Sequence, residues 1–424
     1  MSEFESWSDE LPRCTQSGIG VIPNAKYIGG IMRQSHEFMH KCLNLSKNGV
    51  QFYGIFCAYN DDQRAAKYVS NRLAYEIFEE ENPITTAMEP EQIQEALKAK
   101  FSTVVQLYHQ DINELLVRRL LQKEQLTEES KEMVAKINAK LRAATTVVAA
   151  VIVNDHIYII NCGNSRVLAL VADSGNSCDW QLNEEHDMAN QDEIERLKLT
   201  GVDPRNFVSP TRAVGDCFRG LNYTENPDLK GVISQPLISE PDVYVYPVDE
   251  FQCSHLLLCS ASVVKVIQEI GVEPPHVNQF LVSELVREKE HSASKSCITL
   301  AQAVLDSLTR QHRESASQMQ NSSHDDMSLV LASLTEIMSA AVQQSRVTMT
   351  TADNTNSLSM EDTIESEGTI PSNDPRPYVD CDGFNEHPLA QELRIELERL
   401  FVKITKKNIA KDSIEEEGPF SIDL

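Results

Sequence analysis

Residues 51–62 read QFYGIFCAYNDD and decide the fold. The apolar run over residues 52–57 predicts a buried strand, and Asp61 or Asp62 after the turn can cap a helix. Many hydrolases carry metal-binding carboxylates on a loop that a buried strand delivers to a site, because divalent cations need rigid oxygen ligands. Here the corresponding positions are Cys57, Ala58 and Tyr59, which suggests a site whose chemistry has been removed.

The helix expected after this loop has one apolar face, formed by Ala65, Val69, Leu73 and Ile77. A second, longer helix is predicted to open at Pro90, a favoured first-turn residue. Its expected apolar stripe consists of Ile93, Leu97, Phe101, Val105, Tyr108, Ile112 and Leu115.

Composition places the chain among globular proteins and narrows its partners. The chain has 424 residues, 41% of them hydrophobic, and its 64 acidic against 38 basic residues give a net charge of -26. Such an excess of negative charge argues against nucleic acid and against anionic membranes as partners. Proteins or peptide segments with a positive charge are more suitable partners for a chain with this net charge.

The ten cysteines do not indicate disulfides. Cys57, Cys162 and Cys259 lie in or beside apolar runs, and no spacing is typical of a secreted framework or a zinc site, so buried free thiols are expected. Residues 1–12 lack the features of a secretion signal, and residues 147–153 are too short an apolar run to span a bilayer. We therefore expect a cytoplasmic protein, and nuclear localisation as well is compatible with the sequence.

Strand candidates follow one another over residues 146–173, with turns at Asn154–Asp155 and at residues 163–165. This order predicts an antiparallel meander. Gly18, Gly20, Gly29 and Gly30 are interpreted as punctuation between short strands. Further helices are expected over 187–201 and 299–313, and strands over 255–260 and 327–334. Strands grouped with strands, with long helices outside them, predict an α+β fold: a two-sheet antiparallel β-sandwich flanked by helices.

The composition changes after the last predicted strand. Residues 339–376 contain no Phe, Trp or Tyr and are rich in Ser, Thr and Asn, so burial cannot offset their chain entropy. We expect a folded domain over 1–335, a disordered acidic linker over 336–376, and a C-terminal docking segment over 377–424. A helical repeat of leucines over 389–404 supports the last of these.

Five ordered stretches carry a resemblance to the metal-dependent type 2C protein phosphatases. FYGIFCAY resembles that family's FFGVFDGH, NCGNSR its NCGDSR, SPTRAVGD its SRALGD and HDDMSLVL its closing DNMT-type strand. HLLLCSASVVKVI is similar to its apolar strand ending in ASDGxxD. The order agrees over about residues 14–335, and ordered matches are far more specific than one short motif.

The resemblance implies a two-sheet sandwich whose edge holds two divalent cations through aspartates. Most of those ligand positions have changed here, to Cys57, Ala58, Asn164, Ala261 and Lys265. Neutral side chains of this kind cannot neutralise hard dications, so no metal and no other cofactor is expected. The chain is then a pseudophosphatase with no catalytic residues and a degenerate site, which also includes Tyr59.

Residual acidic positions remain at Asp216, Asp325 and Asp326. If Lys265 points into the old site, its charge could pair with Asp325 in place of the lost cation. A solvated helix-face lysine is the favoured interpretation, because lysine is rarely buried. An N-terminal match to RxxMED keeps Arg33, a candidate phosphate-binding residue, and Glu37.

Within that superfamily the chain resembles the family of TGF-beta-activated kinase binding proteins, through its leader SWSDELP and a tail similar to PYVDFAEF. The tail positions that match are Pro377, Tyr378, Val379, Asp380 and Phe384. The resemblance implies that this segment docks on a TGF-beta-activated MAP kinase kinase kinase and activates it. Two aromatic residues on a polar tether have the composition of an anchor for a hydrophobic groove.

Three functions are therefore open. The first is a non-catalytic, kinase-activating adaptor in TGF-beta, stress or Wnt-linked signalling. The second is a divergent metal-dependent serine/threonine phosphatase that uses Asp216, Asp325, Asp326 and Glu37. The third is a phosphopeptide-binding module that holds phosphate with Arg33. In the tail, Cys381 and Pro388 depart from the family pattern, and the leucine repeat can alternatively fold back or self-associate.

Overall fold

The computed structural model describes residues 13–28, 31–34, 37–60, 62–79, 81–125, 127–173, 176–248, 253–291, 296–316 and 321–337. No helix in these ranges combines the length and apolar character needed to cross a bilayer. The described residues end at 337, so the proposed division at 335 and 376 stays a prediction.

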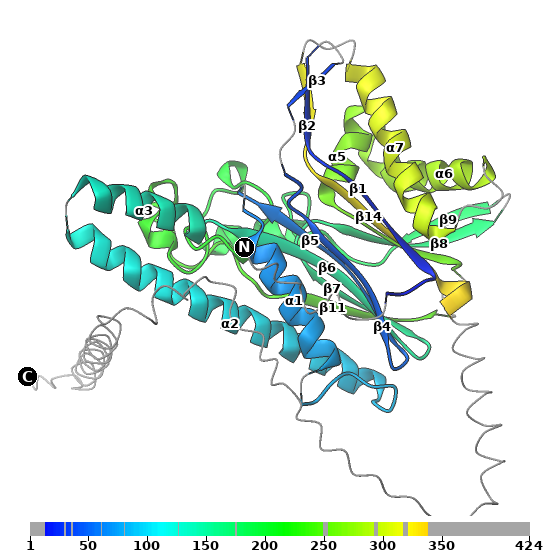
Figure 1. The fold of residues 1–424 in the computed structure, drawn as a ribbon, viewed down its shortest axis with the longest axis horizontal. Helices are drawn as coiled ribbons and strands as arrows, with labels where there is room; N and C mark the ends of the chain where they lie inside the picture. The colour runs from blue at the N-terminus through cyan, green and yellow to red at the C-terminus, as the bar shows by residue number, and fades with distance from the viewer. Residues whose placement is uncertain are drawn as a thin grey trace, which may run out of the picture. The chain divides into compact units, whose positions relative to one another are not determined.

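Two antiparallel sheets pack face to face and helices cover their outer faces (Figure 1). One sheet has the order β11-β7-β6-β5-β4, with β10 beside β6, and the other has the order β1-β14-β12-β8-β9. The strands of the first are β4 Lys41–Lys47, β5 Val50–Tyr59, β6 Ala144–Val153, β7 His156–Cys162, β10 Val214–Gly215 and β11 Asp242–Pro247. Those of the second are β1 Ser17–Ile22, β8 Arg166–Asp173, β9 Asn176–Gln181, β12 His255–Cys259 and β14 Met327–Ser333. The predicted α+β sandwich is confirmed.

Helices form the two outer layers. Against the first sheet lie α1 Arg64–Phe78 and α2 Pro90–Glu124, and against the second lie α5 Ala261–Glu269, α6 Val277–Glu290 and α7 Cys297–Ala316. The remaining helices are α3 Glu128–Leu141 and α4 Gln191–Leu199, with 3-10 turns at Pro204–Asn206, Tyr223–Glu225, Pro227–Leu229 and Pro274–His276. A small sheet of the order β13-β2-β3 comprises β2 Ala25–Ile28, β3 Ile31–Gln34 and β13 Asn321–His324.

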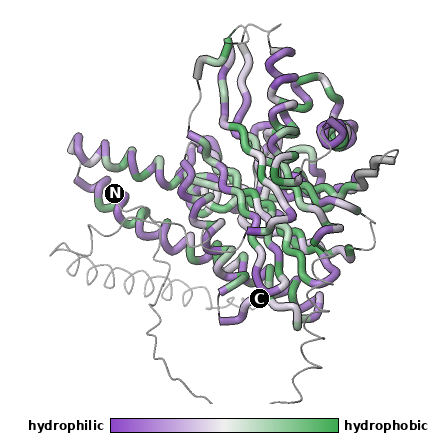
Figure 2. The backbone as a smooth tube through the Cα atoms, turned by 45° about the vertical axis from the view of Figure 1, so that its right-hand side comes forward, coloured by the Kyte–Doolittle hydropathy of each residue, from purple (hydrophilic) through white to green (hydrophobic). Residues whose placement is uncertain are grey.

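The core between the sheets explains the longest apolar run. Every residue of β6 is buried, because one of its faces meets the helices and the other meets the opposite sheet, which is typical of a sandwich-core strand. Figure 2 shows hydrophobic residues concentrated in these central strands. The inter-sheet core includes Tyr53, Ile55 and Val148 from one sheet and Val167, Leu258 and Val330 from the other.

The two long helices predicted first are both present. Ala65, Val69, Leu73 and Ile77 of α1 are fully buried, and Asp62 accepts a hydrogen bond from the backbone N–H of Arg64 in the first turn. In α2 the predicted stripe faces the core, although Val104 takes the fully buried position beside Val105, which is partly buried. The helical period was therefore read correctly.

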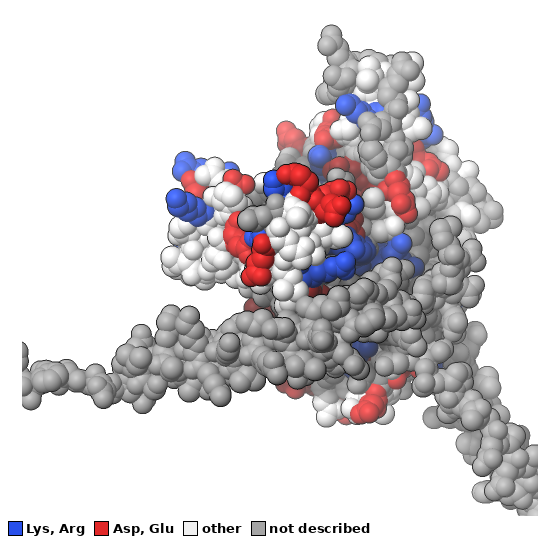
Figure 3. All heavy atoms as spheres, turned by 60° about the vertical axis from the view of Figure 1, so that its left-hand side comes forward, with Lys and Arg blue, Asp and Glu red and all other residues white. Residues whose placement is uncertain are grey.

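The face of the domain that Figure 3 shows carries acidic and basic side chains interspersed with one another. On α3, Lys131 pairs with Glu128 and Lys136 with Glu132, each at 2.7 Å. Exposed pairs of this kind are worth at most about 1 kcal/mol. The negative charge of the chain is therefore not gathered into a single patch on this face.

The predicted meander is wrong at its second turn. β6 and β7 form a hairpin, but β8 crosses to the opposite sheet, where it pairs with β9 and β12. The crossing occurs at Gly163, whose φ is 152° and where an added Cβ would lie 2.3 Å from the Cβ of Thr146. Strand patterns alone carry no information on which sheet receives a strand.

The expectation that Gly18 and Gly20 separate short strands is wrong, because both residues lie inside β1. A Cβ on Gly20 would come 2.5 Å from the carbonyl oxygen of Ala301 in α7. The strand and the backbone of the helix thus approach each other more closely than any side chain would permit.

We predict that Gly20→Ala lowers the free energy of unfolding by about 1–3 kcal/mol, the usual cost of overpacking, because the new methyl group would push α7 away from β1. The matched control is Gly220→Ala, whose Cβ would meet its nearest atom at 3.4 Å; we expect a change within about 0.5 kcal/mol. Urea unfolding of both variants measures the difference. Equal losses would contradict this account of the α7–β1 contact.

Candidate functional site

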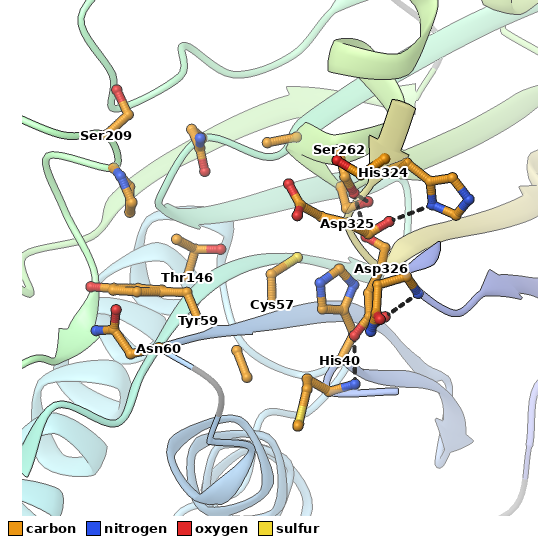
Figure 4. A pocket seen from close by; sticks show the side chains of 18 of the residues that line it. His40, Cys57, Tyr59, Asn60, Thr146, Ser209, Ser262, His324, Asp325 and Asp326 are labelled. Carbon is orange, nitrogen blue, oxygen red and sulfur yellow. Dashed lines mark hydrogen bonds between the residues drawn. The ribbon is translucent and has the colours of Figure 1, made fainter. Parts of the chain in front are cut away.

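A cavity of about 530 Å³ opens at one edge of the sandwich (Figure 4). Residues far apart in the sequence meet there. Cys57, Ala58 and Tyr59 come from the end of β5, Asn164 from the turn after β7, and Ala261 from the start of α5. The structure therefore brings five of the six predicted degenerate positions into one pocket.

Asp326 lines this pocket but its carboxylate is engaged. Its side-chain Oδ1 accepts hydrogen bonds from the backbone N–H of Asn24 at 2.6 Å and from Asn24 Nδ2 at 2.7 Å. Its Oδ2 accepts one from the backbone N–H of Met39 at 2.6 Å, and the residue is 5% exposed. Asp326 therefore fastens the N-terminal strands to the turn before β14.

Asp325 and Lys265 do meet, with 3.3 Å between Nζ and Oδ2. The contact lies in solvent, because the two side chains are 75% and 56% exposed, and Lys265 is not part of the pocket lining. Both interpretations of Lys265 are thus correct in part: it pairs with Asp325, but as a solvated residue of α5. An exposed pair contributes at most about 1 kcal/mol and does not replace a buried cation.

Asp216 lies apart from the other two acids and does not line the pocket. It adopts a left-handed φ of 47°, is 4% exposed, accepts a hydrogen bond from Asn60 Nδ2 at 3.4 Å, and lies 3.8 Å from Arg219 Nη1. Burial raises the pKa of this carboxyl, while the Arg219 guanidinium opposes the rise. Beside it, burial and the Asp216 charge raise the pKa of the Tyr59 phenol well above its usual range.

These positions do not fit two divalent cations. The carboxylate of Asp326 accepts hydrogen bonds from backbone N–H groups, that of Asp325 pairs with a lysine in solvent, and that of Asp216 lies near an arginine. Within the described ranges, no three His, Cys, Asp or Glu side chains converge as a metal site. Glu37, the fourth acid of the phosphatase alternative, accepts a hydrogen bond from Gln63 at 3.0 Å.

His40 is the pocket residue that sequence reasoning missed. His40 immediately precedes β4, whose Lys41 pairs with Phe56 of β5, and it lines the pocket together with Cys57. Its Nδ1 lies 2.8 Å from Ser328 Oγ. Burial lowers the pKa of His40, but Cys57 and the charges of Asp326 and Asp325 raise it by a larger amount, so the pKa lies above its usual value.

The structure does not describe the side chains of the remaining predicted positions. Arg33 lies in β3, and its side chain is not described. Pro377, Tyr378, Val379, Asp380 and Phe384 lie outside the described residues. The eight cysteines with described side chains are free thiols; five of them are buried, as expected, whereas Cys42, Cys57 and Cys297 are partly exposed.

The chain is similar to several known proteins. The profile of the family Protein phosphatase 2C matches residues 83–269. The TGF-beta-activated kinase 1 and MAP3K7-binding protein 1 of Caenorhabditis elegans is 33% identical over 391 residues, which are 90% of this chain and 95% of that protein.

Two solved structures align with part of the chain. A sex-determining protein of C. elegans aligns with 76% of this chain and 66% of its own, at 12% identity and a TM-score of 0.47. The serine-threonine phosphatase 2C of Toxoplasma gondii aligns with 76% of this chain and 97% of its own, at 16% identity and a TM-score of 0.46.

We predict that Asp326→Ala lowers the free energy of unfolding by about 3 kcal/mol, because it leaves two backbone N–H groups without their charged acceptor. The neighbouring Asp325→Ala removes the same charge, and we expect a loss below about 1 kcal/mol, because its ion pair is exposed. Urea unfolding of both variants provides the comparison. An Asp325→Ala variant as unstable as Asp326→Ala would contradict this division of roles.

Proposed function

The chain belongs to the family of the TGF-beta-activated kinase 1 and MAP3K7-binding protein 1, and on that premise we propose that it is a non-catalytic, kinase-activating adaptor. The observation that carries the proposal is the extent of the similarity, which covers 90% of this chain and 95% of a relative named for binding a kinase. The partner is a MAP kinase kinase kinase of the TGF-beta-activated class, and residues 377–424 dock on it.

The pocket supports the absence of catalysis. A metal-dependent phosphatase uses its cations to lower the pKa of a bound water from about 15.7 toward about 7. Here the three residual aspartates face three different partners. Without a metal pair, the population of hydroxide at neutral pH falls by on the order of eight decades.

The C-terminal segment supports docking through its composition. Tyr378 and Phe384 restore aromatic character after a long stretch without any, and aromatic side chains dominate binding hot spots. Joined to a folded domain, such a segment would let the adaptor act on its kinase while the domain positions the complex. We place this activity in the cytoplasm, shared with the nucleus, within TGF-beta, stress or Wnt-linked signalling.

We predict that the full chain captures the kinase and that Tyr378→Ala/Phe384→Ala reduces capture at least about tenfold, the loss expected when hot-spot aromatics are removed. Quantitative pull-down and kinase activity measure the effect. A matched control is Leu199→Ala, a 78% exposed residue of the folded domain, for which we expect unchanged capture. Equal recovery of the double variant would overturn the docking proposal.

We also predict that the chain does not hydrolyse a phosphothreonine peptide in the presence of manganese, whereas an active type 2C phosphatase does so under the same conditions. Release of phosphate is the measurement. Manganese-dependent hydrolysis that disappears in Asp325→Ala would establish the phosphatase alternative instead. Binding of the peptide without hydrolysis, weakened by Arg33→Ala, would establish the phosphopeptide-binding module.

A further inference from the structure

The polar side chains that line the pocket differ in whether the fold already uses them. The carboxylate of Asp326 accepts three hydrogen bonds, and Ser262 donates one to the backbone oxygen of Asp326. Thr146, Asn164 and Ser209 line the same cavity, and their side chains have no hydrogen-bond partner among the described residues. Three uncharged side chains with donors and acceptors are therefore available to a ligand.

Figure 4 shows that these two kinds of side chain lie on different sides of the cavity. Thr146 and Ser209 lie on the same side as the ring of Tyr59, whereas the carboxylates of Asp325 and Asp326 lie on the other side. Thr146 is 3% exposed, so the uncharged side extends into the interior of the domain. The pocket thus has an uncharged wall that is separate from its acidic wall.

The charged and titratable side chains of the lining are either exposed or already engaged. Lys26 is exposed, and Asp325 is 75% exposed in its ion pair with a lysine of α5. Asp326 is 5% exposed, but backbone N–H groups compensate its charge. The rings of His40 and His324 have hydroxyl or backbone partners. Among the described residues, the uncharged wall therefore holds no Lys, Arg, Asp or Glu.

This distribution of charge selects the chemistry of a ligand. A phosphate group at the uncharged wall would lose its water without meeting a cation, which is unfavourable for a buried charge. A hydroxyl group carries no net charge and can both donate and accept hydrogen bonds. The cavity volume of about 530 Å³ lies within the usual range of ligand sites, about 300–1,000 Å³.

We propose that the pocket binds the uncharged side chain of a serine or threonine on a segment of a partner protein, and that phosphorylation of that side chain prevents binding. Its hydroxyl group exchanges hydrogen bonds with Thr146, Asn164 and Ser209. At the mouth, Lys26 and Asp325 provide a donor and an acceptor for the peptide groups on either side. Binding of this kind requires the absence of a phosphate, which is the opposite of a phosphopeptide-binding module.

This inference goes beyond the docking proposed for residues 377–424, and it shares with that proposal only the premise that the pocket does not catalyse. The two proposals assign different partners' segments to different parts of the chain. One can therefore fail while the other holds.

The test titrates the full-length chain with short peptides capped at both ends. The first is Ala-Ala-Thr-Ala-Ala, the second carries phosphothreonine at its centre, the third carries alanine there, and the fourth ligand is capped threonine alone. The methyl groups of Ala58 and Ala261 line the pocket and report binding by NMR, and that of the core residue Ala149 is the control. We expect saturable shifts with the threonine peptide and at least about tenfold weaker binding of the other three ligands.

Each other result of the titration contradicts the proposal. Equal or tighter binding of the phosphothreonine peptide would overturn it in favour of the phosphopeptide-binding module. Equal binding of capped threonine would indicate a site for free small molecules, and equal binding of the alanine peptide would exclude recognition of the hydroxyl. The absence of shifts up to about 10 mM, the range of very weak binding, would also overturn it.

Two variants test whether binding occurs at the uncharged wall. Thr146→Val and Ser209→Ala each remove a hydroxyl group that has no protein partner, so we expect both variants to fold and to bind the threonine peptide about three- to tenfold more weakly. The matched control is Ser283→Ala, which removes an exposed hydroxyl group of α6, and its affinity is expected to be unchanged. Unchanged affinity in both pocket variants would overturn the proposal, and either variant decides the matter if the other fails to fold.

The double variant Tyr378→Ala/Phe384→Ala separates this proposal from kinase docking. We expect it to bind the threonine peptide as the unaltered chain does, whatever its capture of the kinase. A loss of peptide binding in this variant would place the binding site outside the pocket and overturn the proposal.

Discussion

The face-to-face packing of the two sheets is the constraint on which the rest of the structure depends. Side chains such as Tyr53 and Leu258 close a core between the layers, and helices α1, α2 and α7 close the outer faces. Because β5 and β12 lie in opposite sheets and end at the same edge, the loops that follow them converge there. The pocket is a consequence of this packing.

The acidic residues at that edge have become part of the architecture. Asp326 holds the N-terminal segment through backbone N–H groups from Asn24 and Met39, which a bare carboxylate does at least as well as a metal-bound one. Asp216 sits in a strained left-handed conformation beside Arg219. Asp326 and Asp216 thus each stabilise a local connection of the fold.

The uncharged side chains of Cys57, Asn164 and Ala261 in the pocket lining limit what the pocket can bind. The adaptor activity proposed for residues 377–424 and the pocket of the folded domain use different parts of the chain. They can therefore be tested and can fail independently.

The sequence by itself determined several of the helices and strands, among them α1, α2, β6 and β12, since their hydrophobic periods reflect local burial. Ordered motifs also predicted which metal-ligand positions lack an acidic side chain, because the order of motifs assigns positions without coordinates. Tertiary structure alone decided that β8 joins the second sheet, that the strand at Gly20 lies against the backbone of α7, and that His40 lines the same pocket as Cys57. Those three results depend on contacts between segments, which spacing along one chain does not encode. The docking segment remains a prediction from sequence alone.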